Sequence, residues 1–259
     1  KEWVVPGRAL PVRSDALSVY EIQSEVKAQG QRGTCSIFSA TALFEAMLIK
    51  NRLAQRDIDL SEEWLQYLIA QYNTDYGSTS PANFSALREW GQPLESDLPY
   101  IGEEWESSSS GLAKERCGGL KNSILKRCLV GHRNPDLLNK RDEEMLKVGG
   151  KFYDPEFVQA RKSALDFAKY LSGSNDDYEI IGSISEIKRL LASGTPITLD
   201  LDFFYGAWNH RLANELGIGR DMDLWSKGIV TYPEQGSLDE EKSHTKPAGH
   251  SFVLIGYDD

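Results

Sequence analysis

The stretch AQGQRGTCSIFSA, residues 28–40, combines a glycine-rich segment, a lone cysteine and the start of an apolar run. Two glycines, two glutamines and an arginine precede Cys35, and a run of mostly apolar or small residues follows from 36 to 49. A helix that is apolar nearly all round is a buried helix. The pattern therefore predicts a glycine-rich turn that delivers one cysteine to the start of a buried helix.

This arrangement supplies the parts of a thiol active site. A cysteine reacts as its thiolate, and the unpaired N–H groups at a helix N-terminus lower a thiol pKa. A histidine can pair with the thiolate and later donate a proton. An upstream amide can donate to the oxyanion formed in acyl transfer. Gln29, Gly30, Gly33 and Cys35 provide the amide, the turn and the thiol in that order. Each feature alone is more often structural, since a lone cysteine in an apolar helix is usually core.

The first hundred residues have the sequence patterns of helices. Ser61 is the expected N-cap of a helix that continues through EEWLQYLIAQY, residues 62–72. Pro81 stands near the start of a following helix, and Gly91 stands at its end. A long amphipathic helix is expected in DPEFVQARKSALDFAKYLSG, residues 154–173, with Asp154 as cap and Gly173 past the end.

The rest of the chain reads differently. Residues 101–150 look irregular and charged, and a short helix is expected within 184–196. The segments 197–204, 228–232 and 251–257 have the composition of strands, and the first of them alternates apolar and polar residues. A helical first half and a strand-rich second half predict an α+β protein with two lobes.

Composition, net charge and the length of apolar runs exclude some classes of partner. The chain has 259 residues, 40% of them hydrophobic and 26% charged, as in ordinary globular proteins. A net charge of −10 gives no basic surplus for phosphates, so nucleic acid is not expected as a partner. No apolar run reaches the roughly 18 residues of a membrane span, so no membrane association is expected. The chain starts at Lys1 rather than at Met, which suggests that an upstream segment was removed.

The chain contains three cysteines. Cys117 and Cys128 are spaced so that a small disulfide loop is possible, which would leave Cys35 as the free thiol. That pattern fits a protein of a secreted, periplasmic or lysosome-like compartment that keeps one thiol for chemistry. The alternative is three unrelated reduced cysteines in a cytosolic protein.

Two blocks of the sequence together resemble the papain-like (C1) cysteine peptidases. VKAQGQRGTCSIFSA, residues 26–40, is similar to the active-site segment of that family, including the six positions from Gln29 to Cys35. AGHSFVLIGYDD, residues 248–259, resembles the strand that carries the family's histidine. Between them, LSEEWLQYL resembles the family's second helix, and residues 76–100 resemble its substrate-facing segment. Residues 101–175 do not align.

The resemblance implies a single domain over 1–259 with a cleft between two lobes. The helical lobe would cover about 28–150, and the strand-rich lobe about 175–259 with the N-terminal segment. Cys35 would be the nucleophile and His250 the general base and acid. Gln29 and the backbone N–H of Cys35 would form the oxyanion hole. Gly77, Ser78 and Gly249 would contact the substrate, with Ser80 nearby.

The sequence departs from the family at four points. Arg32 stands where many members carry a disulfide cysteine, Ser36 replaces a tryptophan, and Gly77-Ser78 replaces a pair of glycines. The fourth departure is the family's orienting asparagine, which should follow the histidine strand and is not found before Asp259. We therefore expect the intact protein to continue, or a second chain to supply the missing C-terminal strands. The 28 residues before Gln29 are too few for the usual prosegment, which would then be a separate or removed partner.

The leading prediction is a peptidase that hydrolyses protein or peptide substrates through an acyl-enzyme. A catalytically silent papain-like binding module and a thiol acyltransferase remain alternatives. No CxxC or HExxH spacing occurs, so neither a metal site nor a cofactor is predicted. His210 lies next to Asn209, but adjacent side chains seldom point the same way, and His132 and His244 are expected at the surface.

Overall fold

The computed structural model describes residues 19–146, 154–171 and 178–257, and it combines many helices with one small sheet. The α+β class predicted from the sequence is therefore confirmed. In chain order the elements are α2 (Cys35–Lys50), α3 (Glu62–Ile69), α4 (Ser80–Trp90), α5 (Gly111–Cys117), α6 (Asn122–Gly131), η1 (Pro135–Asn139), η2 (Asp142–Met145), α7 (Pro155–Leu171), α8 (Ile184–Ala192), β1 (Ile197–Asp202), α9 (Leu212–Glu215), α10 (Met222–Ser226), α11 (Leu238–Thr245) and β2 (Gly249–Leu254).

Local capping signals set the ends of the longer helices. The Ser61 hydroxyl accepts a hydrogen bond from the Trp64 N–H at 3.1 Å, and Asp154 accepts one from the Phe157 N–H at 3.0 Å. Gly91 ends α4 with φ 67°, and a Cβ there would lie 2.1 Å from the carbonyl oxygen of Ala164 on α7. The predicted caps are confirmed, except that Gly173 lies outside the described residues.

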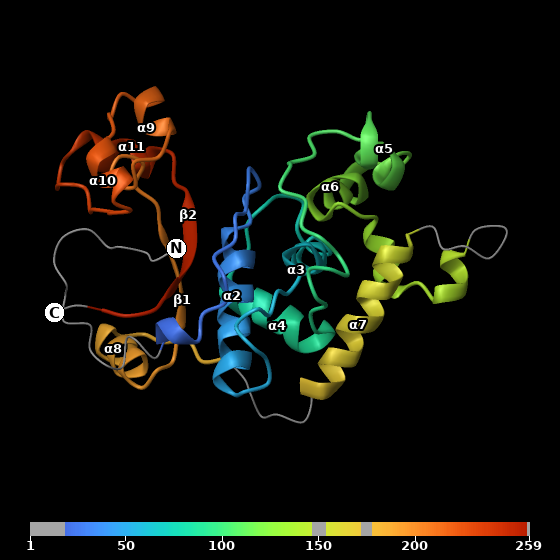
Figure 1. Ribbon diagram of the computed structural model, residues 1–259. Helices are drawn as coiled ribbons and strands as arrows, with labels where there is room; N and C mark the ends of the chain where they lie inside the picture. The colour runs from blue at the N-terminus through green and yellow to red at the C-terminus, as the bar shows by residue number, and fades with distance from the viewer. Residues whose placement is uncertain (1–18, 147–153, 172–177, 258–259) are drawn as a thin grey trace.

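The sheet is an antiparallel pair of strands that lies along α2. β1 pairs with β2 in a register that sets Leu201 opposite His250 and Asp200 opposite Ser251. Figure 1 shows both strands running beside α2, with α9, α10 and α11 at one end of the pair and α8 at the other. The remaining helices, α3 to α7, lie on the other side of α2. Helix α2 thus lies between the sheet and the helices α3 to α7.

Two apolar clusters hold the helical part together. The larger one is built on Trp64, Tyr67 and Phe157, whose rings lie within 4.9 to 6.0 Å of one another. The smaller one places Ile37 of α2 against Leu65 of α3 and Leu87 of α4. All eight residues of α3 are buried, so this short helix is enclosed on every side, acidic first turn included.

The strand-rich second half predicted from the sequence is wrong. Within the described residues the sheet contains only β1 and β2, and GIVTY, residues 228–232, is not a strand. Its backbone hydrogen bonds go elsewhere, from the Ile229 N–H to the Leu224 carbonyl and from the Thr231 N–H to the Ala207 carbonyl. Ile229 and Tyr232 are 43% and 77% exposed, so this β-branched and aromatic run has no sheet to pack against.

The prediction that residues 101–150 are irregular is also wrong in part. They contain α5, α6 and two short 3₁₀ helices. A disulfide joins Cys117, the last residue of α5, to Cys128 of α6, with 5.7 Å between the two Cα atoms. Cys35 is the free cysteine, so the predicted pairing is confirmed.

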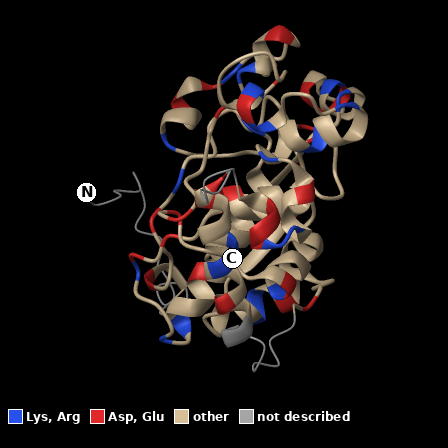
Figure 2. Ribbon diagram, turned by 90° about the vertical axis from the view of Figure 1, so that its right-hand side faces the viewer, with Lys and Arg blue, Asp and Glu red and all other residues tan. Residues whose placement is uncertain are grey.

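Acidic and basic positions are interspersed along the helices rather than gathered on one element (Figure 2). Within the described part of the chain, every helix is too short or too polar to cross a bilayer.

Candidate active site

Cys35 is the first residue of α2, and its thiol is free and half-buried. Thr34 precedes it as N-cap, but the Thr34 hydroxyl contacts the Tyr100 hydroxyl at 2.7 Å and does not cap the helix. The first N–H groups of α2 therefore keep their partial positive charge unneutralised by any capping side chain. A helix N-terminus of this kind is a favourable place for negative charge.

The turn that leads to Cys35 is held by the segment around residue 100. The Gln31 N–H donates to the Gly102 carbonyl at 3.0 Å, and the Tyr100 hydroxyl donates to the Gln29 carbonyl at 2.9 Å. Gly30 has φ 66°, and a Cβ there would lie 2.7 Å from the Gly102 oxygen. The glycine is thus needed for a close approach between two backbones.

The side chain of Gln29 lies in the same turn. Its amide Nε2 donates to the backbone carbonyl of Arg32 at 2.9 Å. A primary amide carries two N–H donors, so the second one is left for another acceptor. The structure therefore ties the predicted oxyanion donor to a backbone atom three residues before Cys35.

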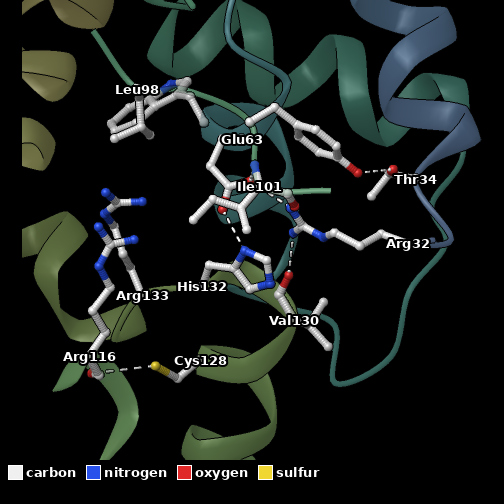
Figure 3. Close-up of polar contacts among 12 residues, drawn as sticks. Arg32, Thr34, Glu63, Leu98, Ile101, Arg116, Cys128, Val130, His132 and Arg133 are labelled. Atoms are coloured by element: carbon white, nitrogen blue, oxygen red, sulfur yellow. Dashed lines mark hydrogen bonds and ion pairs between the residues drawn. The ribbon is translucent and has the colours of Figure 1, made fainter. Parts of the chain in front are cut away.

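The side chain of Arg32, a residue of this turn, lies in a buried cluster of charged and polar groups (Figure 3). The Arg32 guanidinium is fully buried and donates to Glu63 Oε2 at 2.5 Å, to the Ile101 carbonyl at 2.9 Å and to the Val130 carbonyl at 2.9 Å. His132 approaches the same carboxylate from another side, with Nδ1 2.9 Å from Oε1 of Glu63. The His132 ring stacks on Trp105, with 3.9 Å between the ring centroids.

Charge within this cluster is balanced. Burial favours the neutral form of Glu63, but Arg32 and the contact with His132 outweigh it and lower the pKa of Glu63 to about 2. Burial lowers the pKa of His132 and outweighs the opposing effect of the Glu63 carboxylate, and the neighbouring arginines lower it further, so the imidazole is neutral and Arg32 is the counterion of Glu63. The sequence-based placement of His132 at the surface is wrong, because the ring is fully buried.

A hydroxyl and amide network links the start of α2 to the predicted substrate-facing segment. The Ser36 and Ser78 hydroxyls lie 2.7 Å apart, and the Ser78 hydroxyl donates to Asn83 Oδ1 at 2.7 Å. Asn83 Nδ2 in turn donates to the Ser36 carbonyl at 2.8 Å. Gly77 is exposed, with φ 101° and open space where a side chain would stand. The structure therefore brings Gly77 and Ser78 next to the helix turn of Cys35.

His250 lies on β2, half-buried among aromatic rings. The ring centroids of Trp208, Phe203 and Phe252 lie 5.2, 6.1 and 6.3 Å from that of His250. Burial lowers the pKa of His250, and the charge of His210 lowers it further. Among the described residues no side chain or backbone group hydrogen-bonds the His250 ring, so nothing in this part of the chain plays the role of an orienting asparagine.

The neighbours of His250 connect the sheet to the helical part. Gly249 is exposed and precedes it, and Ser251 follows it with a hydroxyl that donates to Asp200 at 2.6 Å. Asp200 also accepts from the N–H and the hydroxyl of Ser80, each at 3.2 Å. Asp200 is therefore a bridge from β1 and β2 to the start of α4, and the sequence offered no signal for it.

The elements that carry Cys35 and His250 pack against each other. Strand β2 packs against α2, and the first turn of α2 and the start of β2 lie at the same end of this pair (Figure 1). The two side chains do not hydrogen-bond each other. Asn209 is buried and accepts from the Asp221 N–H, and His210 accepts from the Leu212 N–H, so these neighbours do not form a pair. His244 is exposed, as predicted.

The described residues contain no group of three or more His, Cys, Asp or Glu side chains that could hold a metal ion. No model of a known protein family matches the chain, and comparison with curated proteins and with solved structures also finds no match.

Proposed function

We propose that this chain is a papain-like cysteine peptidase that hydrolyses peptide bonds with Cys35 as nucleophile and His250 as general base and acid. The observation that carries the proposal is the free thiol at the first residue of α2, with the strand of His250 packed along that same helix. In this proposal the cleft runs between the helical part and the β1–β2 part. The disulfide between Cys117 and Cys128 supports a secreted or periplasmic location.

The proposed reaction has two halves. The Cys35 thiolate attacks the carbonyl carbon of the substrate, and the negative charge that forms on the carbonyl oxygen is stabilised by the Gln29 amide and the Cys35 N–H. His250 gives its proton to the leaving amine, and a thioester to Cys35 remains. His250 then takes a proton from water, the water oxygen displaces the thiolate, and a carboxylic acid leaves.

The surroundings of Cys35 support the proposed substrate contacts. Gly77 offers exposed backbone without a side chain in the way, and Ser78 is tied to Ser36 beside the nucleophile. Gly249 is exposed next to His250. An extended peptide lying between these two segments would place its scissile carbonyl at the N-terminus of α2, where helix N–H groups favour a developing negative charge.

The test is the pH dependence of Cys35 alkylation by iodoacetamide in the wild type, in His250→Ala and in the exposed-histidine control His244→Ala. A thiolate–imidazolium pair keeps alkylation fast well below the ordinary thiol pKa of about 8.5. We expect that behaviour in the wild type and in His244→Ala, and its loss in His250→Ala. An ordinary thiol titration in the wild type, unchanged by His250→Ala, would contradict the proposal. Product analysis with an added primary amine separates hydrolysis from acyl transfer.

A further inference from the structure

Arg32 joins four separate parts of the chain at one buried point. Its side chain contacts Glu63 of α3, Ile101 in the loop after α4 and Val130 near the end of α6. The guanidinium also lies 4.9 Å from the centroid of the Tyr100 ring. The three hydrogen-bond partners are 31, 69 and 98 positions away in sequence, so one side chain fixes the turn against α3, the loop after α4 and α6.

The backbone of the same residue holds the predicted oxyanion donor. The Arg32 carbonyl accepts from Gln29 Nε2 and from the Thr34 N–H, each at 2.9 Å. Because the side chain of Arg32 is locked by three acceptors, its carbonyl has a fixed position. The buried contacts of the Arg32 side chain therefore set the direction of the Gln29 amide and the conformation of the backbone before Cys35.

We propose that Arg32, locked by Glu63, is a positioning residue that holds the Gln29 amide and the Cys35 N–H in place for the oxyanion. This inference rests on the proposed peptidase function. Neither Arg32 nor Glu63 touches the reacting atoms, since both side chains are fully buried.

Arginine suits this role because of its geometry. The guanidinium is a planar fork whose donors point in fixed directions, whereas a lysine ammonium is a single charge on a flexible stem. Arg32 uses two nitrogens on three acceptors that lie in different segments. A lysine at this position could reach the carboxylate of Glu63 but could not hold both carbonyls with the same geometry.

We expect replacement of Arg32 to slow only the chemical step in which an oxyanion forms. Acylation by p-nitrophenyl acetate forms an oxyanion when the Cys35 thiolate attacks the ester carbonyl and p-nitrophenolate leaves. Alkylation by iodoacetamide displaces iodide from a saturated carbon and forms no oxyanion. Arg32→Lys should therefore lower the acylation rate about 100-fold, as loss of one oxyanion donor does, and leave the pH profile of alkylation unchanged.

Arg161→Lys is the matched control. Arg161 is also a buried arginine, and it donates to the carbonyls of Leu137, Leu138 and Lys140, outside the turn of Cys35. We expect this variant to lose stability and keep its acylation rate. The double variant Arg32→Met with Glu63→Met removes the ion pair without stranding a charge. It should remain folded and lose acylation as Arg32→Lys does.

Amide hydrogen exchange decides the inference independently of activity. We expect faster exchange in residues 28–38 of Arg32→Lys and of the double variant, with no such change in Arg161→Lys. Unchanged exchange there, unchanged acylation, or an equal loss of acylation in Arg161→Lys would overturn the inference. A wild type with an ordinary thiol titration and no acylation would instead defeat the proposed function, and the exchange data would still show whether Arg32 positions the turn.

Discussion

Replacing Glu63 with glutamine tests what the buried charge cluster contributes to stability. Glu63 is fully buried and is the carboxylate shared by Arg32 and His132. Glutamine has nearly the same shape but no charge, so Glu63→Gln leaves the Arg32 guanidinium buried without a counterion. Removing one partner of a buried ion pair costs about 3–5 kcal/mol, and we expect a loss of that size at pH 6.

The pH dependence of this loss has a definite sign. The pKa of Glu63 is lowered in the folded protein, from an ordinary 4.5 to about 2. Its contribution is therefore fully present above pH 4.5 and is lost as the pH falls toward 2. At 1.36 kcal/mol per pH unit, lowering the pH to 3 removes about 2 kcal/mol of Glu63's contribution from the wild type, whereas Glu63→Gln has no such contribution to lose. The two proteins should therefore converge by about 2 kcal/mol in acid.

The assay is urea unfolding followed by far-UV circular dichroism at pH 6 and at pH 3, for the wild type, Glu63→Gln and Glu115→Gln. Glu115 is exposed, so its replacement should change the free energy of unfolding by no more than about 0.5 kcal/mol at either pH. A Glu63→Gln loss below about 1 kcal/mol at pH 6 would refute the buried-pair argument. A difference in unfolding free energy between the wild type and Glu63→Gln that is the same at pH 6 and at pH 3 would also refute it.

Two further predictions concern stability. Replacing Cys117 and Cys128 together by alanine opens a loop with a sequence separation of 11 and should cost about 3 kcal/mol of unfolding free energy, or roughly 6–12 °C in Tm by calorimetry; a loss under about 1 kcal/mol would contradict it. Burial raises the pKa of Glu95 to about 7, so its contribution is complete below pH 4.5 and is lost as the pH rises through 7. Glu95→Gln keeps an acceptor for the Tyr100 N–H and should gain stability relative to the wild type between pH 5 and pH 8 in thermal melts, whereas a pH-independent difference would contradict this reasoning.

The parts of the fold that could be predicted from the sequence carry their signals locally. Ser61, Asp154 and Gly91 lie within a few residues of the helix ends that they determine, so short motifs identified those ends. Helix α5 has only seven residues, which is too short for an apolar period to stand out among charged neighbours. The run 228–232 has strand composition, but its hydrogen-bond partners come from α10 and from residue 207, and composition does not contain that information.

The same distinction applies to the candidate site. Gln29, Gly30 and Cys35 form a local motif, and the structure gives them a tight turn and a helix start. Glu63 and His132 are 31 and 100 positions from Arg32, and in the sequence each reads as an ordinary polar residue. Their roles follow only from packing, because charges buried by a fold need partners that the fold itself brings together.

The ion pair between Arg32 and Glu63 makes the turn before Cys35 sensitive to the ionisation of Glu63, which a disulfide at this place would not do. In the papain-like peptidases, which the sequence resembles, a disulfide cysteine often stands at the position of Arg32, and thiol reductants would break that disulfide. Here the link responds to the ionisation of Glu63, because protonation of the carboxylate removes the counterion of a buried guanidinium. A reductant would act on the bond between Cys117 and Cys128 instead. That bond steadies α6, whose Val130 carbonyl accepts from Arg32, so its loss would reach the turn only through one intermediate contact. Acid and reductant should therefore affect Cys35 chemistry to different extents, with acid acting directly on the turn.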